Sequence, residues 1–174
     1  MAKMKYTFGF LLCNFLLMAP ISLATTTQAQ ASTYKTKSTT TTSLEHFTKK
    51  GTLPNTKGSI NMTYKTLKKK VPGYSGITEG NFIVYQAKDG ATYIFKPNGN
   101  KSTPNASAKV QAINKVYFKE AYTKQDMQNL YGDPLDNLYK TSKYYVGFSS
   151  YYGNTTLSVG NFKTMQTIAD ISNY

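Results

Sequence analysis

Lysine is the residue type in this chain whose number and spacing point to chemistry. All 21 basic residues are lysine, and the 8 acids that oppose them leave a formal net charge of +13. A charge of this size draws a protein to polyanions. Four lysines lie within six residues, at Lys65, Lys68, Lys69 and Lys70, on or beside the polar face of an expected helix; we call them the helical lysines.

The predicted interface combines these lysines with tyrosine. Lysine is a flexible point charge that contacts phosphates, whereas guanine recognition relies on arginine, which the chain lacks. Exposed tyrosine rings stack on unpaired bases. The alternatives are a solvated lysine face that keeps the protein soluble, and tyrosines that belong to ordinary strand positions. The sequence predicts a nucleic-acid interface without sequence preference, formed by Lys65, Lys68, Lys69, Lys70, Lys115, Lys119, Tyr151 and Tyr152.

Residues suited to catalysis or metal binding are scarce and scattered. The single histidine, His46, has no cysteine to pair with, because Cys13 lies in the apolar N-terminal stretch. No nucleophile elbow and no glycine-rich phosphate loop is present. The closest pair of acids, Asp133 and Asp136, flanks a proline and suits a turn. We therefore expect no catalysis, no metal site and no cofactor.

The N-terminus has the three parts of an export signal. Two lysines precede an apolar stretch over residues 6–24, and Ala29-Gln30-Ala31 provides the small-residue cleavage pattern. We predict a signal peptide over residues 1–31 and a secreted protein, free or loosely associated with the cell surface. An uncleaved membrane anchor is the alternative, because the apolar stretch is nearly long enough to span a bilayer. A cleaved chain without cysteine is typical of proteins exported by Gram-positive bacteria.

The exported chain divides into a leader and one domain. Residues 32–43 are rich in Ser, Thr and Lys without apolar periodicity, which predicts a disordered leader. Residues 44–174 have the length of a single domain. Thr123 with Asp126 resembles a capping box, and Gly132 ends the helix that it begins. A second helix is expected after Thr63.

Strand signals follow each helix. Residues 82–85 and 92–95 flank a Lys-Asp-Gly turn, and residues 110–118 form a third strand. Residues 144–148 and 155–159 flank Gly153-Asn154, with a last strand expected at 164–171. We predict an α+β fold with short helices packed on an antiparallel sheet. The repeated order suggests a duplication over residues 44–118 and 119–174, with coincidence as the alternative.

Two resemblances add to this prediction. The helix and glycine-proline run over residues 123–134, followed by strands, resembles the tandem-repeat fold of the β-lactamase-inhibitor protein and the small outer-membrane-assembly lipoproteins. The signal, the lysine-rich chain, residues 122–132 and the tyrosine-rich strand after them are similar to the secreted immunodominant antigen B family of staphylococci. That resemblance implies a secreted or surface-associated protein that binds nucleic acid.

Two further classes of partner remain open at this point. Anionic teichoic acid of the cell wall would hold the protein by charge alone. A protein partner, such as a secreted or host enzyme that the chain inhibits, would need a contiguous exposed aromatic patch instead of a basic groove. Salt sensitivity separates a protein partner from the polyanions, and competition between DNA and teichoic acid separates those two.

Overall fold

The computed structural model describes residues 43–172 apart from residues 79, 80, 100 and 120. The expected signal peptide lies outside these residues, and so does the expected leader except for Ser43, which begins a helix over residues 43–49. The other elements in chain order are α2 (Tyr64–Lys70), β1 (Gly73–Ile77), β2 (Ile83–Ala87), β3 (Ala91–Phe95), β4 (Ala112–Tyr117), α3 (Lys124–Tyr131), β5 (Leu138–Lys140), β6 (Tyr145–Tyr151), β7 (Asn154–Gly160) and α4 (Phe162–Ser172).

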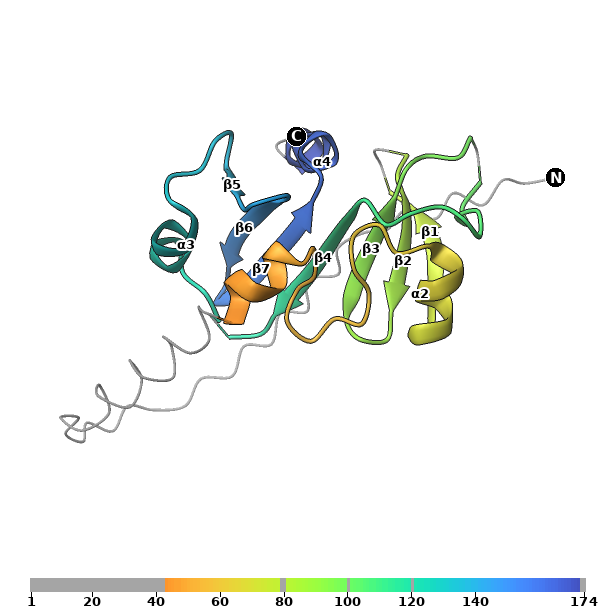
Figure 1. Cartoon of the computed structure of the whole chain (residues 1–174), viewed down its shortest axis with the longest axis horizontal. Coiled ribbons are helices and arrows are strands. Elements are labelled where there is room, and N and C mark those ends of the chain that lie inside the picture. Colours follow the sequence, from red (N-terminus) through yellow and green to blue (C-terminus); the bar gives the residue numbers. More distant parts are fainter. Residues whose placement is uncertain (1–42, 79–80, 100, 120, 173–174) are drawn as a thin grey trace.

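One antiparallel sheet contains all seven strands of the described residues, in the order β1-β2-β3-β4-β7-β6-β5. Strands β1 to β4 come from the first half of the chain and β5 to β7 from the second. The two halves join where β4 pairs with β7, from Ala112 opposite Gly160 to Tyr117 opposite Thr155. Four helices pack on this sheet (Figure 1), so the predicted α+β class is confirmed.

The main core lies on one face of the sheet, here called the front face. It is formed by alternate strand residues such as Tyr85, Tyr93 and Leu157, and by apolar residues of the helices. The Tyr64 ring of α2 meets Tyr85 and Phe95 edge-on, with ring centroids 5.5 and 5.7 Å apart. Figure 1 shows α2 and α3 at opposite ends of the sheet, with the helix over residues 43–49 between them.

Local sequence signals place both predicted helices correctly. The Thr63 side chain accepts a hydrogen bond from the Thr66 amide and caps α2. At α3, Thr123 and Asp126 form the predicted capping box, in which each side chain accepts from the backbone amide of the other. Gly132 ends α3 with a φ of 77°, a conformation that favours glycine.

The hairpin between β6 and β7 turns one residue earlier than predicted. Its two central residues are Tyr152 and Gly153, with φ values of 47° and 72°. Two consecutive positive φ angles are those of the type I′ turn, whose twist suits a two-residue hairpin. The turn therefore holds Tyr152 at the tip of the hairpin, where its side chain is 79% exposed.

The expected last strand over residues 164–171 is wrong, because these residues belong to α4. Phe162, Met165 and Ile168 recur every three residues and pack together on the sheet, which is a helical period. The segment contains β-branched residues, which have strand propensity, but the spacing of its apolar residues is helical. Strands β1 and β5 were not predicted, since β1 contains two glycines and β5 has only three residues.

Helix α4 covers only part of the opposite face, here called the back face. Met165 packs with Val84, Ile94 and Ala112 at the middle of the sheet. Toward the end of the sheet at the β6–β7 turn, the same face carries hydroxyl and amide side chains and the exposed Val116. The predicted strand over residues 110–118 is present as β4, yet its residues Val116 and Phe118 lie at the surface.

The two expected repeats contribute unequal parts of this sheet. The first supplies four strands and the second three, and the second ends in α4 where the duplication required a strand. The duplication itself stays a prediction. Within the described residues, no helix has the length and apolar character needed to cross a membrane.

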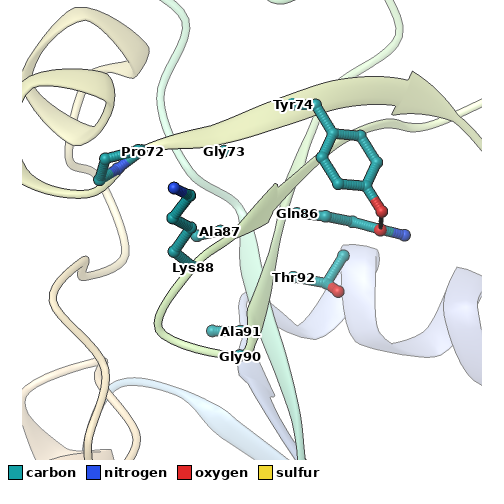
Figure 2. A pocket seen from close by; sticks show the side chains of 9 residues that line it. All are labelled: Pro72, Gly73, Tyr74, Gln86, Ala87, Lys88, Gly90, Ala91 and Thr92. Atoms are coloured by element: carbon teal, nitrogen blue, oxygen red, sulfur yellow. Dashed lines mark hydrogen bonds between the residues drawn. The ribbon is translucent and has the colours of Figure 1, made fainter.

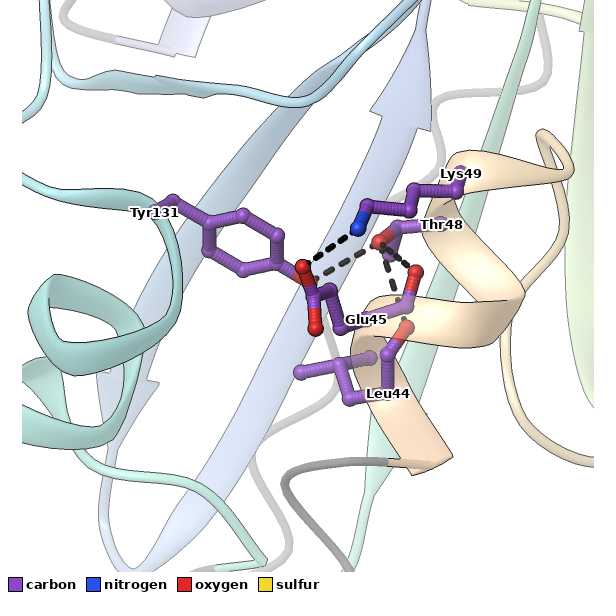
Figure 3. A network of polar contacts seen from close by, with 5 residues as sticks. All are labelled: Leu44, Glu45, Thr48, Lys49 and Tyr131. Carbon is purple, nitrogen blue, oxygen red and sulfur yellow. Dashed lines mark hydrogen bonds and ion pairs between the residues drawn. The ribbon is translucent and has the colours of Figure 1, made fainter.

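A polar contact joins the helix over residues 43–49 to α3. The Thr48 hydroxyl lies 2.8 Å from the Tyr131 hydroxyl and also donates to the Leu44 carbonyl oxygen (Figure 3). Leu44 is fully buried in the main core. Lys49 and Glu45 of the same helix form an ion pair of 2.6 Å, and Figure 3 shows this pair beside the Tyr131 ring.

The packing of α4 leads to the first prediction. Met165→Ala should lower the free energy of unfolding by about 2 to 5 kcal/mol, because it leaves a cavity between α4 and the back face. Gln166→Ala is the matched control, since Gln166 is exposed and alanine favours the helix. Chemical denaturation measures both. Equal costs for the two substitutions would contradict the packing of Met165 on the back face.

Burial of tyrosine hydroxyl groups is expected to make the stability of the fold sensitive to high pH. Burial raises the pKa of Tyr131 to about 12, and burial also raises the pKa of Tyr85 and Tyr122. Unfolded tyrosines ionise near pH 10, so the unfolded chain releases these protons first. Stability is therefore full below about pH 10 and falls as the pH rises toward 12. Tyr131→Phe should flatten this decline in denaturation experiments, and an identical decline in the variant would contradict the assignment.

Candidate nucleic-acid interface

The helical lysines occupy the exposed side of α2. Tyr64 and Leu67 are buried on the inner side, and all four lysines are exposed. Three of the lysines lie in the last turn, where the negative end of the helix dipole stabilises positive charge. Because the helix is anchored by its capped start and its buried residues, the lysines project from a fixed support.

Three of these lysines line one hollow of about 550 Å³. Lys65, Lys68 and Lys69 border it from the helix, together with the Tyr64 ring and, from a separate segment, Pro104 and Ala106. That segment is fixed to α2 because the Lys65 amide donates to the Ala106 carbonyl oxygen at 3.0 Å. Lys70 does not border the hollow, since it lies on a different side of the helix.

No acid neutralises the helical lysines within the described part of the chain. There, the ion pair within 4 Å is that of Lys49 and Glu45, and no carboxylate borders the hollow. Three unpaired ammonium groups around an apolar floor attract a multivalent anion, with phosphate oxygens as suitable acceptors.

Lys115 has a different environment from the other predicted lysines. Its ammonium donates to the carbonyl oxygens of Asn55 and Asp89, both at 2.7 Å, and lies 5.7 Å from the centre of the Tyr117 ring. Burial lowers the pKa of Lys115. Lys115 thus holds the loop around Asn55 against the β2–β3 turn. The Lys115 ammonium is therefore already engaged in hydrogen bonds within the protein.

The remaining predicted residues gather at another end of the sheet. Tyr151 and Tyr152 form the tip of the β6–β7 hairpin, with exposures of 67% and 79% and ring centroids 4.2 Å apart. Lys119 is exposed and follows β4 by two residues. Tyr117 of β4 pairs with Thr155 of β7, so the end of β4 lies beside this hairpin tip.

The structure therefore divides the eight predicted residues into three places. The helical lysines stay together on α2, while Lys119, Tyr151 and Tyr152 meet at the sheet end. Sequence reasoning missed Phe118, which is 81% exposed next to Lys119. The alternation of side chains along β4 is the sequence signal that could have found it. Ile113 and Tyr117 face the main core, so Val116 and the next even-numbered residue, Phe118, are expected away from it.

A second hollow, of about 610 Å³, lies at the β1 edge. Figure 2 shows the Tyr74 ring reaching from β1 to Gln86 of β2, where its hydroxyl donates to the carboxamide oxygen, with Lys88 on the other side. Among the described residues that border this hollow, Lys88 alone is charged. We place the candidate site at α2, because multivalent anion binding needs several cations.

The histidine and the acids form no catalytic arrangement among the described residues. His46 is exposed, and its ring meets the neighbouring Phe47 edge-on at 6.1 Å. No group of three His, Cys, Asp or Glu residues lies close enough to hold a metal ion in the described ranges. No protein-family model, curated protein or solved structure matches this chain. The resemblance to the antigen B family stays a prediction.

The environment of Lys115 predicts a structural role. Lys115→Gln should lower the free energy of unfolding by about 1 to 3 kcal/mol, because one or both carbonyl contacts are lost. Lys119→Gln removes the same charge from an exposed position and should change stability by less than about 0.5 kcal/mol. Denaturation of both variants decides the role. Equal stabilities would contradict it.

Proposed function

We propose that this protein is a secreted, non-enzymatic binding protein of a Gram-positive bacterium that binds polyanions, nucleic acid foremost, without sequence preference. The observation that carries the proposal is the group of exposed lysines on α2, three of which surround one hollow that no acid among the described residues borders. The export signal, the charge of +13 and the antigen B resemblance support it.

Lysine determines the expected mode of binding. An ammonium group contacts phosphate oxygens through charge and adapts to the backbone of single- or double-stranded nucleic acid. Affinity therefore follows the number of phosphates and not the base sequence. The helical lysines span about 8 Å along the axis of α2. Phosphates of one duplex strand follow each other about every 3.4 Å along the duplex axis, so the four lysines cover roughly two phosphate spacings. Teichoic acid also carries phosphates, and competition between it and DNA separates the two ligands.

A protein partner is the second candidate. The exposed aromatic side chains at the sheet end, Phe118, Tyr151 and Tyr152, are the feature that favours it. Aromatic residues are enriched in protein interfaces. Binding to such a partner would change little with salt, whereas polyanion binding weakens steeply.

Substitution of the helical lysines tests the proposal. Changing Lys65, Lys68, Lys69 and Lys70 together to Gln should weaken binding of all DNA sequences alike, because four phosphate contacts are lost. Each contact adds about 0.7 to 0.9 to the slope of log affinity against log salt, so the slope should become shallower by roughly 3. The fold should persist, since all four side chains are exposed.

A second quadruple variant separates a site from overall charge. Lys96, Lys140, Lys143 and Lys163 are also exposed, and changing them to Gln removes the same charge from other surfaces. This control should retain most of the affinity and the slope. The α2 site is wrong if both variants lose affinity equally, and the backbone mechanism is wrong if one DNA sequence is strongly preferred.

A further inference from the structure

The sheet end beside the β6–β7 turn carries exposed aromatic rings that the main core does not use. Phe118, Tyr151 and Tyr152 are 81%, 67% and 79% exposed; we call them the sheet-end aromatics. Burial of a large aromatic side chain is energetically favourable. Three exposed side chains of this kind at one end of the sheet therefore indicate a surface that a ligand covers.

The strand register brings these rings within reach of one ligand. Tyr117 pairs with Thr155, and Tyr151 pairs with Asn154, so Phe118 and the hairpin tip follow neighbouring strands. Adjacent strands lie about 4.8 Å apart, which places the β4 and β6 backbones about 10 Å from each other across β7. This separation suits rings that stack on successive or alternate bases of an extended strand.

The back face beside the rings is polar. Val116 pairs with Thr156, which pairs with Ser149, and all three side chains point to the back face together with Tyr151. Hydroxyl groups between exposed rings hydrogen-bond to base edges in any register, whereas the centre of a protein interface is mostly apolar. Lys119, next to Phe118, adds a cation for the phosphate backbone.

We propose that the sheet-end aromatics form a stacking platform for unpaired bases, which makes single-stranded nucleic acid the preferred ligand. The platform rests on the proposed function, in which the helical lysines hold the phosphate backbone. Charge complementarity favours this occupant, because a chain with a net charge of +13 repels a second copy of itself and attracts a polyanion. In duplex DNA the bases stack on one another inside the helix, so their faces are not accessible to the aromatic rings.

An oligonucleotide without bases tests the platform separately from the charge. The protein is titrated with a 12-nucleotide oligothymidine and with an abasic oligomer that carries the same number of phosphates. Stacking of one or two bases should make the oligothymidine bind roughly 10-fold tighter or more, with equal salt slopes for the two ligands. A triple variant, Phe118→Ala with Tyr151→Ala and Tyr152→Asn, should abolish this difference and leave abasic binding unchanged; asparagine tolerates the positive φ of residue 152.

Two variants control for the fold and for the chemistry of the ring. Tyr74→Ala removes another exposed aromatic residue, 61% exposed on the back face at the β1 edge, and should preserve the 10-fold preference. Tyr151→Phe keeps the ring and should preserve it as well. Thermal unfolding of the triple variant should match that of the wild type, because the removed side chains are exposed.

The outcomes separate this inference from the proposed function. Equal binding of the two oligomers by the wild type would overturn the platform and leave polyanion binding intact. Absence of binding to both would overturn the platform together with the proposed function. A preference for oligothymidine that survives in the triple variant would also overturn the platform, and the sheet-end aromatics would then be assigned to a protein partner.

Discussion

The pairing of β4 with β7 is the interaction on which the rest of the structure depends. It joins two antiparallel groups of strands into one sheet and so creates a continuous front face for the main core. It also sets the two surface features apart. The helical lysines lie over the β1–β3 side, where Tyr64 packs on Tyr85, whereas the sheet-end aromatics lie where β4 ends beside the β6–β7 turn.

Much of the fold could be predicted because its signals are local. The capping box of Thr123 and Asp126, the Thr63 cap and the two hairpins each depend on a few consecutive residues. The failures have the opposite cause. The segment of α4 is rich in β-branched residues, and its helical spacing outweighs their strand preference only because Met165 finds an apolar surface on the back face. Such a surface exists only after the sheet has formed.

The candidate site could be predicted in part for the same reason. Lysines on one short helix share a surface by helical geometry alone, so their grouping follows from the sequence. The role of Lys115 does not, because its carbonyl partners Asn55 and Asp89 come from two distant loops. Phe118 was expected in a strand and lies at the surface, since the alternation along β4 turns Ile113 and Tyr117 to the core.

The central claim is that the helical lysines hold a polyanion by its phosphates. Amide chemical shifts of the isotopically labelled protein, followed during titration with a short oligonucleotide at low salt, test this claim directly because they locate the ligand. The account predicts the largest shifts at residues 64–70 and 104–106, a second group at 118–119 and 151–153, and reversal of both groups by added salt. Shifts confined to the β1 edge around Tyr74 and Lys88, or no shifts at all, would contradict it.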